Sequence, residues 1–385
     1  MTPSERYVSS LCKKSFLPFW SYPSPLGKKG KELCDVLIIC GNDIIIISVK
    51  DIKLSEHPDE SVQYHRWYNK AIDSSLDQIY GAEKFLESVD EITLKDRVTK
   101  VKLPNKKERS VYRIAIAFGS QEKFPFSTGD FGKGFVHVFD EESTSIVISE
   151  LDTFPDFINY LQSKEKFANG KRISLHKEVD FLALYKETSL DFDYAIDMLT
   201  IDEGLWDKYI KSEEYNEWKR DIQVSFIWDE IIDQLYILHI EKESNTSRRE
   251  DLEIATRLIN MECRNNRIVL GEALESAMVN NLRSRMIKLD IETDHVYVYL
   301  KIDSKNWTYK ENELKLRCLV ARGKVPHISK VIGIGIGVSP QGECIFDYAY
   351  LDISELSEEI INEIEKTKDE LGFFKEPLVK QTSKN

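Results

Sequence analysis

Two apolar runs near the N-terminus form a clear pattern in the sequence. The second run holds four consecutive isoleucines at positions 44–47 and ends in Ser48-Val49-Lys50. Such a run is typical of a strand that is buried on both faces of a sheet. The first run starts at Asp35, and the Asn42-Asp43 pair between the runs favours a tight turn. The pattern therefore predicts an antiparallel hairpin over residues 33–50 that brings Asp35 and Lys50 together.

The rest of the first half alternates between helical and extended patterns. Apolar positions spaced three and four residues apart predict helices, and alternating positions predict strands. The expected helices cover residues 4–16, 58–87 and 154–163, and the expected strands cover 111–118, 135–139 and 145–148. A basic, glycine-containing stretch at 164–172 follows, and we place a domain boundary there.

The second half begins with short mixed elements and then consists mainly of strands. Helices are expected within 248–289 and over 354–371, and strands over 295–302, 314–321, 331–338 and 347–353. The glycines at 333, 335 and 337 lack the spacing of a nucleotide-binding loop and are expected to leave one strand face bare for close packing. The predicted fold class is α/β (α+β mixed), with a mixed sheet flanked by helices in domain 1–168 and an acidic α+β domain at 173–385.

Composition indicates a folded, cytoplasmic protein. Hydrophobic residues make up 42% of the 385 positions, and no apolar stretch approaches the roughly 18 residues that span a bilayer. The start of the chain lacks the apolar segment of a signal peptide, and no membrane partner is expected. The six cysteines include no Cys-x-x-Cys pair or closely spaced Cys/His set, which indicates reduced thiols and no zinc site.

The net charge of −13 is unevenly distributed along the chain. Residues 1–172 carry 25 Lys/Arg and 25 Asp/Glu, whereas the remaining 213 residues carry 28 against 41, which accounts for the whole excess. The neutral half has basic clusters that can contact phosphates, although each is equally well explained as a solvated loop. These clusters are Lys28, Lys29 and Lys31; Lys100, Lys102, Lys106, Lys107 and Arg109; and Lys164, Lys166, Lys171 and Arg172.

A lysine at the end of a buried strand requires compensation, because burying its charge alone costs several kcal/mol. Asp35 is the natural partner, and a period of two places Ser48 and Lys50 on one strand face. Glu32 precedes Asp35 by three residues, and Glu5 on the first helix meets Asp35 if that helix crosses the sheet. Carboxylates that hold Mg²⁺ or Mn²⁺ beside a lysine can hydrolyse a phosphodiester. A plain structural ion pair would produce the same pattern.

The helix after the hairpin adds a second polar signal. Trp67, Ala71, Ser75, Gln78 and Ala82 recur at helical spacing, and their small members allow close approach to the sheet. Gln78 is the polar exception among them, and it either contacts a phosphate or water or binds nearby backbone. Beside this stripe, Arg66 and Lys70 are candidates for contact with a nucleic-acid backbone, as are Lys29 and Lys31.

These residues together resemble the PD-(D/E)XK, or restriction-endonuclease-like, nuclease superfamily. The segments that carry the resemblance are Glu5, Glu32-Leu33-Cys34-Asp35, Ile47-Ser48-Val49-Lys50 and Gln78-Ile79-Tyr80. The resemblance covers residues 4–88 and extends toward 165. It implies that Asp35 is a metal ligand, Lys50 the catalytic lysine, Glu5 the helix carboxylate and Gln78 a supporting polar group, with Mg²⁺ or Mn²⁺ as cofactor.

One position departs from the pattern of the superfamily. The residue two before the lysine is normally Asp or Glu, and here it is Ser48, whose hydroxyl is a poor Mg²⁺ ligand. Either Glu5, Glu32 or Asp51 supplies the missing charge, or the site binds metal weakly, or it is no longer catalytic. Asp51 is the weakest substitute because a regular strand points it away from Lys50.

Three functional hypotheses follow. The first is a metal-dependent nuclease that acts on DNA, with a C-terminal domain for homo-oligomer formation or trigger sensing; the resemblance implies a role in bacterial restriction or anti-phage defence. The second is a catalytically degenerate nucleic-acid-binding or regulatory module. The third is a scaffold with a buried ion pair.

Overall fold

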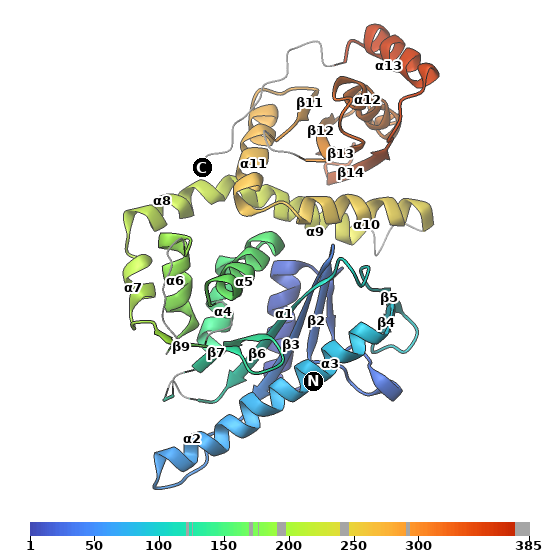
Figure 1. The fold of residues 1–385 in the computed structure, drawn as a ribbon. Helices are drawn as coiled ribbons and strands as arrows, with labels where there is room; N and C mark the ends of the chain where they lie inside the picture. The colour runs from blue at the N-terminus through green and yellow to red at the C-terminus, as the bar shows by residue number, and fades with distance from the viewer. Residues whose placement is uncertain are drawn as a thin grey trace. The chain divides into compact units, whose positions relative to one another are not determined.

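The computed structural model describes residues 1–120, 123–124, 126–168, 172–175, 177–190, 198–238, 246–289 and 293–373. The chain divides into two compact units, residues 1–217 and 218–385 (Figure 1). Both units combine helices with a sheet, which confirms the predicted mixed α/β fold class. The predicted boundary at 164–172 lies within the first unit, because β9 (Arg172–Leu175) and β10 (Met198–Thr200) extend its sheet.

The first unit is organised around a mixed sheet. Among the described residues its strand order is β1-β2-β3-β6-β8-β7-β9-β10. The pairs β3/β6, β6/β8 and β9/β10 are parallel, and the other neighbours are antiparallel. Besides β9 and β10, the strands of this sheet are β1 (Ser21–Pro23), β2 (Val36–Cys40), β3 (Asp43–Asp51), β6 (Ser110–Phe118), β7 (Phe126–Asp130) and β8 (Phe135–Phe139).

The predicted hairpin is confirmed as β2 and β3. Val36 pairs with Ile47 and Cys40 with Asp43, so the turn falls at Gly41-Asn42. All of β2 is buried, and so is β3 from Ile44 to Val49. The aliphatic run therefore lies inside the sheet, as a strand covered on both faces requires.

Helices cover both faces of this sheet. The long predicted helix is α2 (Glu60–Tyr68), a π-helical turn (Asn69–Asp73) and α3 (Ser74–Ser88), and α3 packs on β3 and β6. On the other face α1 (Pro3–Phe16) packs against β1, β2, β3 and α4. The unit also contains α4 (Glu141–Glu150), α5 (Phe154–Ala168), α6 (Glu178–Thr188), α7 (Leu205–Tyr209) and a short hairpin of β4 (Glu91–Thr93) and β5 (Lys100–Lys102); α8 (Glu213–Asp221) spans the division between the units.

The second unit contains a four-stranded sheet with the order β11-β12-β13-β14. Strands β12 and β13 are parallel and are joined by α12, while the outer pairs are antiparallel. An added Cβ at Gly333 would lie 2.6 Å from Cys318 Sγ on α12, so the bare strand face does serve close packing. The elements are α9 (Phe226–Ile237), α10 (Thr246–Asn260), α11 (Arg264–Val279), β11 (Ser284–Ile287), β12 (His295–Ile302), α12 (Lys310–Lys324), β13 (Lys330–Val338), β14 (Cys344–Asp352) and α13 (Glu358–Leu371).

Two predicted strands are helices in the structure. Residues 145–148 belong to α4, which begins where Asp140 accepts a hydrogen bond from the Ser143 backbone amide at 2.6 Å. Residues 314–321 belong to α12, whose buried positions 314, 317, 318 and 321 have helical spacing. The helical period was hidden because position 317 is a buried arginine, which does not contribute to an apolar pattern.

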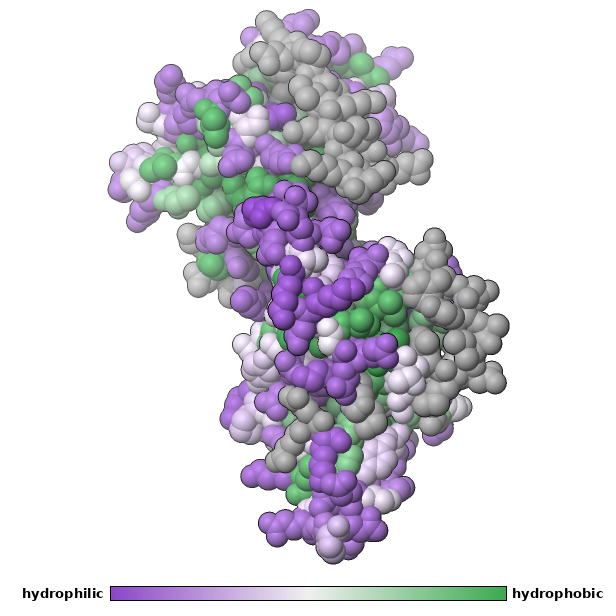
Figure 2. All heavy atoms as spheres, turned by 90° about the vertical axis from the view of Figure 1, so that its left-hand side faces the viewer, coloured by the Kyte–Doolittle hydropathy of each residue, from purple (hydrophilic) through white to green (hydrophobic). Residues whose placement is uncertain are grey.

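The outer surface is mainly polar on the face drawn in Figure 2, where hydrophobic residues form only small separate areas. Among the described residues no helix is both long enough and apolar enough to cross a bilayer.

Candidate active site

Asp35, Lys50 and Gln78 meet on the face of the sheet that α3 covers. Lys50 Nζ lies 3.7 Å from Asp35 Oδ2 and donates a hydrogen bond to Gln78 Oε1 at 2.7 Å. The Asp35 side chain is 4% exposed and that of Lys50 is 26% exposed. The carboxylate is therefore nearly enclosed, whereas the amine remains accessible from solvent.

The register of the hairpin explains why these groups meet. Asp35 directly precedes β2, and its backbone amide donates to Ile47 O at 3.1 Å, so the antiparallel pairing continues past Val36. The Asp35 carboxylate then accepts a hydrogen bond from the Val49 backbone amide at 2.7 Å. This contact fixes the carboxylate beside the strand that carries Lys50.

The helix stripe is confirmed as the surface that faces the sheet. Trp67, Ala71, Ser75 and Ala82 are buried, and Gln78 is half-buried beside them. The stripe passes through the π-helical turn, a feature that is frequent at functional sites. Gln78 points its amide oxygen to Lys50, so a side-chain partner satisfies it rather than backbone.

Ser48 precedes Lys50 by two residues and lies on the same face of β3. Its side chain is fully buried, and its hydroxyl donates to Gln78 Oε1 at 2.8 Å and lies 3.2 Å from Ser75 Oγ. The hydroxyl is thus engaged with α3. Ser75, which in turn donates to Ala71 O at 2.7 Å, is a supporting residue that the sequence analysis did not assign to the site.

A second carboxyl group adjoins Asp35 from the approach to the hairpin. Glu32 lies in an exposed loop, yet local desolvation raises the pKa of its carboxyl group; a hydrogen bond with Asp35 and the negative charges of Asp35 and Glu5 raise it further, while Lys95 lowers it. Two carboxyl groups in such proximity favour a shared proton or a bound cation. Glu32 therefore places a second acidic group beside Asp35 from a different chain segment.

The other two candidate acids have partners of their own. The Glu5 carboxylate accepts a hydrogen bond from the Thr2 backbone amide at 2.8 Å within the capping box of α1. Its charge reaches Glu32, but the contacts of the described residues do not include the predicted meeting of Glu5 with Asp35. Asp51 lies on the α1 face, where it accepts a hydrogen bond from Ser4 at 2.5 Å. It points away from Lys50, as the strand period predicts.

The basic candidates differ in exposure. Arg66, Lys70, Lys29 and Lys31 are all exposed, and none of them takes part in an ion pair among the described residues. Lys164, from another predicted basic cluster, is fully buried. The suggestion that Lys164 contacts phosphate is therefore wrong, because its amine binds both oxygens of Glu178 at 2.5 Å.

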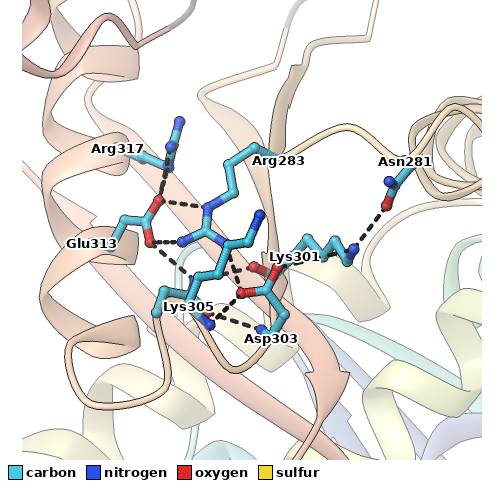
Figure 3. Close-up of polar contacts among 8 residues, drawn as sticks. Asn281, Arg283, Lys301, Asp303, Lys305, Glu313 and Arg317 are labelled. Atoms are coloured by element: carbon cyan, nitrogen blue, oxygen red, sulfur yellow. Dashed lines mark hydrogen bonds and ion pairs between the residues drawn. The ribbon is translucent and has the colours of Figure 1, made fainter.

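The second unit has a dense polar cluster of its own (Figure 3). Arg283 donates to Glu313 at 2.7 and 3.1 Å and to Asp303 at 3.1 Å, and Arg317 donates to the same Glu313. Burial opposes ionisation of Glu313, but hydrogen bonds from Arg283, Arg317 and Asn306 hold its pKa below the usual range. The carboxylates are matched to arginines here, so the cluster joins β11 to α12 and the loop before it.

Comparisons with protein-family models, with curated protein sequences and with solved structures find no match to this chain. A functional assignment must therefore come from the residues and their geometry.

Proposed function

We propose that the first unit is a metal-dependent nuclease of the PD-(D/E)XK type that hydrolyses phosphodiester bonds, with DNA as the expected substrate. The observation that supports this most directly is the convergence of three predicted residues. The Lys50 amine lies 3.7 Å from Asp35 and 2.7 Å from Gln78, at a solvent-accessible end of a buried strand.

The donor set fits a hard divalent cation. Mg²⁺ is commonly held by one or two carboxylates together with water and substrate phosphate oxygens. Among the described residues no group of three or more His, Cys, Asp or Glu is poised as a ready ligand set, so the adjoining carboxyl groups of Asp35 and Glu32 are the proposed pair. We assign Glu5 an electrostatic contribution through its charge on Glu32. When bound, Mg²⁺ or Mn²⁺ would lower the pKa of a water molecule and offset phosphate charge.

The protein side chains have distinct roles in this proposal. The Lys50 ammonium would offset the negative charge that develops on the scissile phosphate, and the donors that it does not direct to Gln78 can orient the attacking water. Gln78 holds the ammonium in place through its amide oxygen. The exposed residues Arg66, Lys70, Lys29 and Lys31 would bind the nucleic-acid backbone without sequence preference.

Plasmid cleavage with Mg²⁺ or Mn²⁺ tests the proposal. Asp35→Ala and Lys50→Ala should each lower the cleavage rate by at least about 100-fold, the scale of removing one group that stabilises transition-state charge. Lys208→Ala and Asp202→Ala are matched controls, because both residues are exposed and lie near the opposite edge of the sheet. Cleavage that persists in both site variants would contradict the proposal.

A second candidate function is supported by Ser48. Because this side chain is fully buried and bonded to α3, it cannot act as the usual second ligand, and a catalytically degenerate nucleic-acid-binding or regulatory module is consistent with that. DNA binding without cleavage, unchanged in Asp35→Ala and Lys50→Ala, would favour this candidate. A role in bacterial restriction or anti-phage defence and self-association through the second unit remain predictions of the first proposal.

A further inference from the structure

A small cavity lies next to the candidate active site in the first unit. Its volume is about 290 Å³, and it is bounded by the β4–β5 hairpin and by the loop that follows β1. Figure 1 shows this hairpin beside the C-terminal end of α3. The walls combine apolar and polar side chains, with one cation and one carboxylate among them; the lining residues are Leu26, Gly27, Gly30, Phe85, Glu91, Ile92, Thr93 and Arg97.

Backbone pairing connects this cavity to the acidic pair. Leu26 forms an antiparallel bridge with Thr93 on one side and with Glu32 on the other. Directly opposite residues on paired strands point to the same face, with Cβ atoms about 4.5–5.5 Å apart. Thr93, Leu26 and Glu32 therefore form one row, in which the first two line the cavity and the third belongs to the candidate metal site. The cavity wall and the Glu32 carboxyl group are thus immediate neighbours.

The tip of the β4–β5 hairpin places positive charge at this location. Lys95 and Arg97 are both exposed, and Arg97 also lines the cavity. The tip has an ordered backbone, because the Asp96 carboxylate accepts hydrogen bonds from the amides of Val98 and Thr99 at 2.9 Å. The rim cations are therefore presented on a well-defined turn.

We propose that this cavity receives an unstacked nucleobase from a single-stranded nucleic acid whose neighbouring phosphate lies at Asp35, Glu32 and Lys50. The inference rests on the proposed function and adds a substrate class to it. A cavity with an aromatic wall and a cation at its rim suits a base and its phosphate, as in other single-strand sites, and the Glu91 carboxylate in the same lining is paired with Lys100. A paired duplex exposes no free base face, and extracting a base costs a few kcal/mol, so single strands and frayed ends bind better than blunt duplexes.

Binding in the absence of divalent metal tests the inference separately from catalysis. The probe is a fluorescently labelled oligothymidylate, compared with a blunt duplex at the same ionic strength. Phe85→Ala should weaken single-strand binding about 10-fold and leave duplex binding nearly unchanged, since base stacking on an aromatic ring is lost. Arg97→Ala should weaken binding and reduce its salt dependence. Lys208→Ala, an exposed lysine on α7 near the other edge of the sheet, is the matched charge control.

A second variant covers the case in which Phe85→Ala fails to fold. Thr93→Phe fills the cavity from an adjacent wall and should also weaken single-strand binding selectively. Equal affinity for single strand and duplex, or unchanged single-strand binding in both cavity variants, would overturn the inference. If the protein cleaves no substrate but the cavity variants lose single-strand binding, the proposed nuclease function fails while the nucleobase site stands. If the protein cleaves single strand and duplex equally and the cavity variants have no effect, the nucleobase site fails while the proposed nuclease function stands.

Discussion

The first unit contains two lysine–carboxylate pairs whose environments differ. Lys164 and Glu178 are both fully excluded from solvent, with the amine 2.5 Å from each carboxylate oxygen. The Tyr160 hydroxyl also donates to Glu178, and the Ser143 hydroxyl binds the Glu178 backbone amide at 3.1 Å. Lys50 and Asp35 are 3.7 Å apart, and Lys50 is partly exposed.

This difference distinguishes a structural ion pair from a candidate reactive one. Around Glu178 the contacts from Lys164 and Tyr160 satisfy the carboxylate, and the pair joins α5 to α6. Asp35 instead adjoins a second carboxyl group, Glu32, and its lysine binds a neutral amide. Two carboxyl groups beside an accessible amine can bind a cation and an anionic substrate. The buried Lys164–Glu178 pair can bind neither, because its groups satisfy each other.

The largest expected difference between the two pairs is in stability. Lys164→Met should lower the free energy of unfolding by about 3–5 kcal/mol, because Glu178 remains buried without its charge partner. Lys50→Met should cost less, about 1–2 kcal/mol, since Lys50 is partly exposed, its pair is long and the enclosed Asp35 keeps the hydrogen bond from the Val49 amide. Chemical denaturation measures both values.

A double variant serves as the control for that prediction. Lys164→Met combined with Glu178→Leu removes both charges and should recover most of the loss, as replacing a whole buried pair often does. If Lys50→Met destabilises as much as Lys164→Met, the two pairs are alike and the comparison is invalid.

The buried surroundings of Lys164 also include His137, and we expect this histidine to make the stability of the fold sensitive to acid. Burial lowers the pKa of His137 to about 4, with Lys164 and Arg113 acting in the same direction and Glu165, 3.1 Å from Nε2, opposing them. Because an unfolded histidine titrates near 6.5, the unfolded chain takes up this proton first as the pH falls. His137 should therefore cost up to about 3 kcal/mol of stability between pH 6.5 and 4, and nothing above this range. Unfolding experiments across this range with His137→Phe, which should show a flatter profile, provide the check.

The sequence predicted those features that depend on local periodicity. The hairpin and the α3 stripe followed from periods of 2 and 3.6, and they were sufficient to bring Asp35, Lys50 and Gln78 together. The capped helix α4 and the charge-containing helix α12 were missed, because a capping Asp140 and a buried Arg317 do not register as apolar pattern. The hairpin at 91–102, which places Arg97 at the cavity, has no local signal in the sequence.

A smaller effect is expected at Ser48, a hydroxyl residue where the proposed nuclease class would carry a carboxylate. Ser48→Ala removes the hydrogen bond to Gln78 and the contact with Ser75, and it should cost about 1 kcal/mol of stability. Cleavage should stay close to wild type, because Lys50 still binds Gln78 and the acidic pair is intact. A loss of cleavage comparable with that of Lys50→Ala would show that the hydroxyl itself takes part in the reaction.

The smallest predicted change is in the melting temperature of a Glu32 variant, and it tests the candidate active site directly. Local desolvation, then the hydrogen bond with Asp35 and the charges of Asp35 and Glu5, raise the pKa of Glu32. A carboxyl group whose folded pKa is raised stabilises the fold at low pH and loses that contribution as the pH rises through the folded value. At neutral pH the ionised group is therefore repelled by its neighbours. Glu32→Gln should raise the melting temperature slightly in chelator, with exposed Glu108→Gln as the unshifted control.

In chelator Glu32→Gln is expected to melt slightly above the wild type, and Mg²⁺ should reverse this order of melting temperatures. A ligand that binds only the folded state stabilises it by mass action, so Mg²⁺ should raise the melting temperature of the wild type and of Glu108→Gln. Glu32→Gln should show a much smaller Mg²⁺ shift, because it retains one carboxylate of the proposed pair. Equal Mg²⁺ shifts in all three proteins would mean that Glu32 does not hold the metal, and the acid missing at position 48 would then have no replacement from this segment.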